Sequence, residues 1–240
     1  MRIDILTLFP EMFAGPFDAS IVHRAAERGI VEINVRNLRD WTHDRHHTAD
    51  DTPFGGGPGM VLKPAPIFEA VDAIGTPDAE IVLLTPNGEL LTQRIVQQLA
   101  EASHLILICG HYEGVDERVA EHLATRLVSI GDYVLSGGEI PAMVVTDAVA
   151  RLLPGALGCA DSVREEAHAE GLLEYPQYTR PAVYRGHPVP EVVRSGNHQE
   201  LARWKRREAL RRTNERRPDL IRPEHREELG ELGVDHPPLD

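Results

Sequence analysis

The sequence predicts an α/β fold in which helices cover both faces of a parallel sheet. Short apolar runs alternate with segments of helical pattern through the first 158 residues, and strands that alternate with helices indicate such a sheet. Three of the apolar runs end in glycine-containing turns. In a parallel sheet the carboxyl ends of the strands form the ligand crevice, so these turns are the first place to expect a site.

The expected elements follow the chain from its N-terminus. Apolar residues in 3–8 and 30–35 predict strands, and the helical pattern of 11–28 between them ends at Gly29. The polar, turn-rich segment 36–60 is long for a simple connection, which is typical of a functional loop. The remaining elements that we expect in the first part of the chain are strands 80–84, 104–109 and 127–130 and helices 66–74, 92–101 and 139–153.

The apolar patterning weakens after Gly158. Residues 159–170 are polar and small, and we expect them to form an interdomain linker. The proline- and tyrosine-rich stretch that follows reads as irregular up to Pro190. The sequence therefore predicts an α/β domain over 1–158, the linker, and a small, mostly helical domain over 171–240.

Within the C-terminal part, residues 200–214 form the strongest helical pattern. Trp204 lies on the apolar side of this helix, and we expect it to anchor the core of the small domain. The tail over 222–240 is acidic and ends in prolines, so we expect it to fray.

Composition excludes several classes of protein. A hydrophobic share of 42% beside 26% charged residues excludes a disordered chain, and no apolar run reaches the length of a membrane span. The first ten residues are too short and too interrupted for a signal peptide. Two cysteines, Cys109 and Cys159, cannot form a disulfide framework. We therefore expect a cytoplasmic protein.

The charge distribution leaves two interpretations open. A net charge of −13 argues against an RNA partner, but eight basic residues lie close together in 203–217, and phosphate binding needs such a basic patch. The patch is either a solvated helix face or an RNA-binding surface.

The glycine turns favour a flat ligand. The loops 85–88, 110–114 and 131–138 each follow an apolar strand, and glycine lets main-chain groups press against a ligand, with Tyr133 and Leu135 as apolar walls. Neither standard glycine-rich nucleotide fingerprint is present, which argues against a dinucleotide or a nucleoside triphosphate.

The polar loop 36–60 carries two further candidate features. His43, His46 and His47 lie close enough in sequence to chelate a metal, but RNA contact or loop hydrogen bonding fits them better, because no pattern of cysteines or carboxylates completes a site. The glycine run 55–57 is either a phosphate-binding nest or a hinge.

Four long motifs carry a family resemblance. SIGDYVLSGGEIPAMVVTDAVARLLPG, CGHYEGVDER, DDTPFGGGPGM and GLLEYPQYTRP closely resemble the bacterial tRNA (guanine-37-N1)-methyltransferases of the SPOUT superfamily, from Met1 to about Leu220. The resemblance implies a deep trefoil knot in the parallel sheet, S-adenosylmethionine as cofactor, transfer RNA as partner, a C-terminal tRNA-binding domain, and a homodimer whose active site is shared between chains. A magnesium ion is allowed as an assisting cofactor, but the sequence reveals no ligand for it, and we assign no metal site.

The resemblance also assigns roles to residues. The catalytic pair would be Arg151, on the helix after the glycine loop, and Glu166, which stands where the family has an aspartate. Glu165 and Asp161 are the alternative bases. The RNA contacts would be Pro58, Gly59, Arg203, Arg207 and Arg211. The donor would be bound by Leu84, Pro86, Gly110, Tyr112, Glu113, Ile130, Gly131, Tyr133, Leu135, Gly137, Gly138 and Pro141.

Two other functions remain to be separated from this one. The first is a related knotted methyltransferase that acts on a different RNA target, such as ribosomal RNA or a ribose oxygen. The second is an RNA-binding protein that kept the pocket but lost the catalytic base. Its support is that Glu166 stands where the family has an aspartate.

Overall fold

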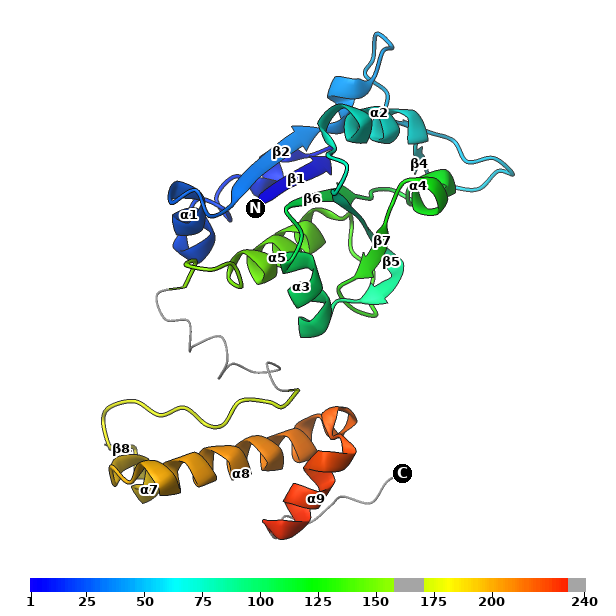
Figure 1. The fold of residues 1–240 in the computed structure, drawn as a ribbon. Helices are drawn as coiled ribbons and strands as arrows, with labels where there is room; N and C mark the ends of the chain where they lie inside the picture. The colour runs from blue at the N-terminus through cyan, green and yellow to red at the C-terminus, as the bar shows by residue number, and fades with distance from the viewer. Residues whose placement is uncertain (158–170, 233–240) are drawn as a thin grey trace. The chain divides into compact units, whose positions relative to one another are not determined.

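The computed structural model describes residues 1–157 and 171–232 (Figure 1). The chain divides into two compact units, Met1–Gly158 and Cys159–Asp240, which we call the N-terminal and C-terminal units. The expected linker over 159–170 lies outside the described residues. No helix in the described parts of either unit is long and apolar enough to cross a membrane.

A five-stranded sheet forms the centre of the N-terminal unit. Its strand order is β2-β1-β6-β5-β7 and all neighbouring strands are parallel. The bounds are β1 Arg2–Thr7, β2 Glu32–Asn37, β5 Glu80–Leu90, β6 His104–Cys109 and β7 Arg126–Ser129. All six residues of the central strand β6 are buried. This agrees with an apolar run that is covered on both faces.

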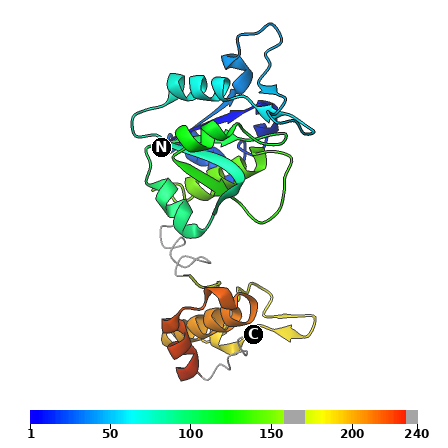
Figure 2. The same cartoon turned by 90° about the vertical axis from the view of Figure 1, so that its right-hand side faces the viewer.

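Helices cover both faces of this sheet (Figures 1 and 2). Along β6, Leu107 and Cys109 face a core shared with α1, α3 and α5, whereas Ile108 faces a second core shared with α2 and α4, as the two-residue period of a strand requires. The helices are α1 Ser20–Glu27, α2 Pro64–Ile74, α3 Gln93–Ala100, α4 Glu117–His122 and α5 Glu139–Ala150, with 3-10 turns η1 Pro10–Phe13 and η2 Leu38–Trp41 and a short ladder of β3 Asp50–Asp51 with β4 Val61–Leu62.

Two expected elements of the N-terminal unit are wrong in detail. The helical pattern of 11–28 forms two separate pieces, η1 and α1, because Gly15 takes a positive φ of 95° and Pro16 follows it. The loop expected at 85–88 is an irregularity inside the longer strand β5. Val128 pairs with Leu84 and again with Glu89, so the intervening residues bulge out of the ladder.

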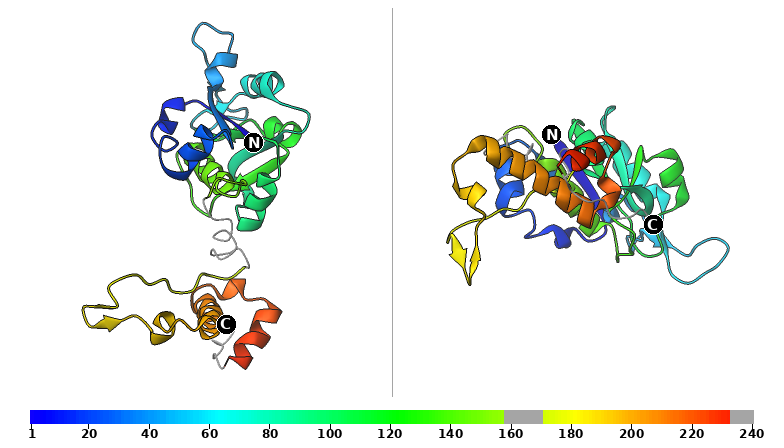
Figure 3. Two further views of the ribbon diagram at one scale, coloured as in Figure 1. Left: turned by 60° about the vertical axis from the view of Figure 1, so that its left-hand side comes forward. Right: turned by 90° about the horizontal axis from the view of Figure 1, so that it is seen from below.

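The C-terminal unit is built around one long helix (Figure 3). Its core consists of Leu172, Leu210 and Leu229, so the helix α8 packs its apolar residues against α9 and the chain that precedes it. Asn197 caps α8 by accepting a hydrogen bond from the Glu200 N–H. The elements are the hairpin of β8 Val183–Tyr184 and β9 His187–Pro188, then α7 Glu191–Arg194, α8 His198–Arg216, η3 Pro218–Leu220 and α9 Pro223–Glu231.

Three expectations for this unit need correction. Trp204 is only partly buried and lies near the Tyr178 ring, with 6.3 Å between ring centroids, whereas Leu210 is the fully buried residue of α8. The tail does not fray throughout. Residues 223–231 form α9, in which Leu229 and His225 are buried against the unit, and 233–240 lie outside the described residues. The stretch expected to be irregular contains the β8–β9 hairpin.

Candidate functional site

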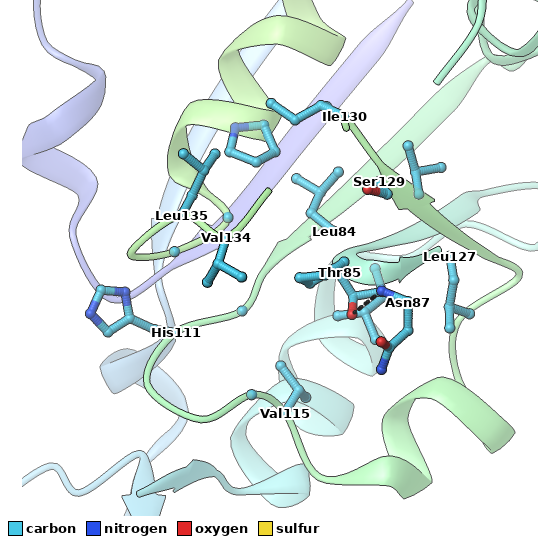
Figure 4. Close-up of a pocket in the computed structure, with 18 of the residues that line it drawn as sticks. Leu84, Thr85, Asn87, His111, Val115, Leu127, Ser129, Ile130, Val134 and Leu135 are labelled. Carbon is cyan, nitrogen blue, oxygen red and sulfur yellow. Dashed lines mark hydrogen bonds between the residues drawn. The ribbon is translucent and has the colours of Figure 1, made fainter. Parts of the chain in front are cut away.

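A cavity of about 430 Å³ opens at the carboxyl edge of the sheet, among the bulged part of β5 and the segments that follow β6 and β7 (Figure 4). This is the position at which open α/β sheets bind ligands. The structure brings to this cavity all twelve residues that the sequence analysis assigned to donor binding, namely Leu84, Pro86, Gly110, Tyr112, Glu113, Ile130, Gly131, Tyr133, Leu135, Gly137, Gly138 and Pro141.

Close contact between two loops forms one wall of the cavity. The Gly138 N–H donates a hydrogen bond of 2.7 Å to the Gly110 carbonyl, and His111 forms a β-bridge with Gly137. A Cβ added at Gly138 would lie 2.6 Å from the Cys109 Cα. The φ of Gly138 is −81°, so glycine is required here by the close approach of two backbones and not by backbone conformation.

The loop after β7 supplies the apolar side of the cavity. Gly131 has a φ of 156° and lies under the Tyr133 ring, whose hydroxyl donates to the Ile130 carbonyl at 3.2 Å. Val134 and Leu135 follow, and their side chains are exposed toward solvent and the cavity (Figure 4). Exposed apolar side chains beside a pocket favour a flat, partly apolar ligand.

The bulge in β5 forms the opposite side. The Asn87 N–H bonds to Thr85 Oγ1 at 3.3 Å (Figure 4), and Gly88 packs so closely on the Val128 backbone that a Cβ would overlap it. The segment that we expected to be a loop is therefore held against β7. It presents Pro86 to the cavity.

The loop over 36–60 reaches the mouth of the cavity. The Glu113 N–H donates to the Met60 carbonyl at 3.0 Å, and a Cβ at Gly59 would overlap the Glu113 side chain. Gly59 and its neighbour Pro58, both exposed, therefore lie beside a residue that lines the cavity. Figure 1 shows the last part of this loop, which leads into β4, extending from the body of the N-terminal unit.

A buried carboxylate lies behind the glycine wall. Glu139 is 1% exposed, and its Oε1 accepts a hydrogen bond of 2.8 Å from the Thr7 hydroxyl. Its Oε2 faces His111 Nδ1 at 3.9 Å, and that nitrogen has no hydrogen-bond partner among the described residues. Burial raises the pKa of the adjacent Cys109 thiol well above its usual value, and the charge of Glu139 adds to this rise.

Two side chains at this site were not predicted from the sequence. His111 lines the cavity, and its ring lies 4.7 Å from those of Phe9 and Tyr112. Its place between Gly110 and Tyr112, directly after an apolar strand, was a usable signal. The role of Glu139 depends on Thr7, 132 residues away, and no local pattern reveals such a contact.

Arg151, the one proposed catalytic residue that the structure describes, is not among the residues that line the cavity. Arg151 is half-buried at the C-terminal end of α5, thirteen residues after Gly138, which corresponds to about 20 Å of helix. Glu166, Glu165 and Asp161 lie outside the described residues.

The arginines assigned to RNA lie on α8, in the C-terminal unit. Arg203 and Arg207 are exposed. Arg211 pairs with Glu208 at 2.8 Å and with Glu215 at 2.6 Å. Those carboxylates raise the pKa of Arg211 and compete with any phosphate for its guanidinium group.

The histidine-rich turn has local partners. His43 Nε2 lies 2.6 Å from Glu69 Oε2, and His47 Nδ1 lies 3.2 Å from Thr42 Oγ1. Hydrogen bonds from Thr48 lower the pKa of Asp44 to about 2. Within residues 1–157 and 171–232, no group of three or more His, Cys, Asp or Glu side chains could hold a metal ion.

Comparison with known proteins identifies the family. Residues 1–223 match the family model described as tRNA (guanine-1)-methyltransferase TrmD. The chain is 58% identical to the tRNA (guanine-N(1)-)-methyltransferase of Dictyoglomus turgidum over 221 residues, which cover 92% of this chain and 90% of the relative. It is 56% identical to the protein of the same name from Geobacillus kaustophilus over 223 residues, covering 92% and 91%. This chain therefore belongs to the tRNA (guanine-1)-methyltransferase family.

Proposed function

We propose that this enzyme transfers a methyl group from S-adenosylmethionine to N1 of guanine 37 in the anticodon loop of transfer RNA. The observation that carries the proposal is the cavity at the carboxyl edge of the sheet, where three strand ends converge. Relatives that are 58% and 57% identical are named tRNA (guanine-N(1)-)-methyltransferases. Because the chain covers 90% of each of them, both parts of the molecule are available for the reaction.

The cavity fits the methyl donor. Its volume of about 430 Å³ is in the usual range for small-molecule sites, and the glycines at 131, 137 and 138 leave main-chain groups accessible. Tyr133 and Leu135 supply apolar surface for a flat ring. When bound there, S-adenosylmethionine supplies an electrophilic methyl group on a sulfonium centre.

Methylation of N1 requires that guanine lose the proton on that nitrogen. A carboxylate can accept the proton, and a cation can stabilise the negative charge that spreads onto O6. We assign the first role to Glu166 and the second to Arg151. Holding guanine and donor in one geometry supplies much of the remaining acceleration.

We propose further that the active site is shared between the two chains of a homodimer. Arg151 lies about 20 Å along α5 from the cavity wall, so a second copy of the chain is the simplest source of the arginine at each cavity. Ile140 and Val144 are exposed one turn apart on the same helix. They offer apolar surface for such contact.

The remaining assignments follow the division of the chain. We propose that residues 1–158 bind the donor in a sheet with a deep trefoil knot, that 159–170 link the parts, and that 171–240 bind the tRNA, with Arg203 and Arg207 as phosphate contacts. Because its substrate is tRNA, we place the enzyme in the cytoplasm. Magnesium is kept as an assisting cofactor without an assigned site, since residues 1–157 and 171–232 contain no cluster of three candidate ligands.

Substitution of the linker carboxylates tests the catalytic assignment. Glu166→Gln keeps size and hydrogen bonding but cannot accept the proton, so we expect single-turnover methyl transfer to fall about 10²- to 10⁴-fold with unchanged donor affinity. Glu165→Gln is the matched control and should retain activity. If Glu166→Gln is as active as the wild-type enzyme and Glu165→Gln or Asp161→Asn is not, the base is assigned to the wrong residue.

A further inference from the structure

The charged side chains that line the donor cavity are carboxylates. Glu113 and Glu117 contribute carboxylates to its lining, and among the described residues that line it there is no lysine or arginine. Such a cavity repels phosphates and attracts a cation, because its walls focus the field of the carboxylates.

Glu139 adds a third negative charge behind the wall. A Cβ at Gly137, which lines the cavity, would overlap Glu139 Oε2, so only the thickness of a glycine backbone separates this carboxylate from the ligand space. The side chain of Glu139 is 2% exposed. A charge in such a position is weakly screened by solvent and salt.

The groups that face Glu139 stabilise its charge without cancelling it. The Thr7 hydroxyl donates to Oε1, and Glu139 is the first residue of α5, where the helix N-terminus favours a carboxylate. The other ionisable groups beside it are the His111 imidazole at 3.9 Å and the buried Cys109 thiol. No lysine or arginine in the described parts of the chain pairs with Glu139. The field of this carboxylate is therefore available to a ligand.

We propose that Glu139 makes the cavity discriminate between the charged methyl donor and its neutral product. The inference rests on the proposed function, in which N1 of guanine forms a bond to the methyl carbon, the bond from that carbon to sulfur breaks, the electron pair stays on sulfur, and the N1 proton leaves to the base. Sulfur thereby changes from a sulfonium cation to a neutral thioether. The buried carboxylate favours the first state, so the product S-adenosylhomocysteine binds less tightly and leaves.

The size of the preference follows from Coulomb's law. For unit charges roughly 8 Å apart in a medium with an effective dielectric constant of about 20 to 40, the donor should bind about five- to thirtyfold more tightly than the product. The two molecules differ by one methyl group and one charge. A purely structural role for Glu139 would weaken both alike and leave the ratio of their affinities unchanged.

Calorimetric titration of the full-length enzyme at pH 8 in EDTA tests the inference. We expect the wild-type enzyme to prefer S-adenosylmethionine over S-adenosylhomocysteine. Sinefungin, which carries an amine cation near the position of the sulfonium, should resemble the donor. Glu139→Gln should lower the ratio of donor to product affinity about five- to thirtyfold, which is the share of the preference that this one charge contributes. Glu139→Asp keeps the charge and should retain most of the preference.

The outcomes distinguish a failure of the proposed function from a failure of the inference about Glu139. If the wild-type enzyme does not bind S-adenosylmethionine, the proposed function and the inference both fail. If it binds donor, product and sinefungin equally, the inference alone is overturned, and this comparison holds even if the variants do not fold. If the wild-type preference is present but persists in a folded Glu139→Gln enzyme, another charge causes it and the assignment to Glu139 is wrong.

Discussion

Replacing Gly138 with alanine should open the wall of the cavity at the carboxyl edge of the sheet. The new Cβ would lie 2.6 Å from the Cys109 Cα and 2.9 Å from the Gly110 nitrogen, both closer than van der Waals contact allows. Both neighbours are backbone atoms, so no side chain can rotate away and the two loops must separate. Such overpacking costs about 1–3 kcal/mol. Loss of the 2.7 Å hydrogen bond from Gly138 to Gly110 would add about 1 kcal/mol.

Gly110 provides the matched control on the opposite loop. A Cβ there would lie 3.4 Å from Val115 Cγ2 and 3.5 Å from the Leu84 carbonyl oxygen, which is ordinary contact, so Gly110→Ala should cost less than about 1 kcal/mol. Urea unfolding measures the free energy of unfolding of both variants. We expect a loss of about 2–4 kcal/mol for Gly138→Ala, with donor affinity lowered at least about tenfold. If Gly138→Ala is as stable as Gly110→Ala and binds the donor as tightly as the wild-type enzyme, close approach of the two loops does not shape the cavity.

Three other predictions concern charged side chains. Arg203→Gln and Arg207→Gln should each weaken tRNA binding and reduce the slope of log affinity against log salt concentration by about one unit per lost phosphate contact. Arg211→Gln should change this slope less, because Glu208 and Glu215 already pair with that guanidinium group. Equal slopes in all three variants would contradict this prediction. Arg206 holds the pKa of Glu228 below its ordinary value of 4.5. The pair therefore stabilises the α8–α9 contact at neutral pH, and this stabilisation is lost as the pH falls from about 4.5 through the folded pKa. In Glu228→Gln the stability of the C-terminal unit should no longer fall over this pH range, and an acid unfolding profile identical to that of the wild-type protein would refute the prediction. The NMR titration of Asp44 should have its midpoint at about 2, and in Thr48→Val this midpoint should move toward the ordinary value. A midpoint near 4 in the wild-type protein would show that the hydrogen bonds from Thr48 to Asp44 are absent.

Local patterns predicted most of the sheet. Strand 104–109 is observed with the expected bounds, and Thr92 and Glu101 cap the expected helix α3. These elements follow from apolar periodicity and from capping residues, which are local. The bulge in β5 could not be predicted this way, because it depends on Val128 pairing twice along a neighbouring strand.

The candidate site shows the same division between local and distant causes. Glycines after strands indicated the cavity, since glycine permits the close backbone approach seen at Gly138. The burial of Glu139 was not predictable, because its partner Thr7 lies on β1, 132 residues away. Trp204 was expected in the core from its helical position, but Leu210, six residues later, fills the centre of the C-terminal unit. Helical periodicity places a residue on a face, and only tertiary packing decides how deeply that face is buried.

The most direct test of the proposed function is to incubate the enzyme with S-adenosylmethionine labelled in the methyl group and unmodified transfer RNA, then map the methylated nucleoside. The proposal predicts one labelled product, 1-methylguanosine at position 37, and no product from a transcript in which guanine 37 is replaced. Label on a ribose oxygen or at another position of the tRNA, or label found only in ribosomal RNA when both RNAs are offered, would contradict it.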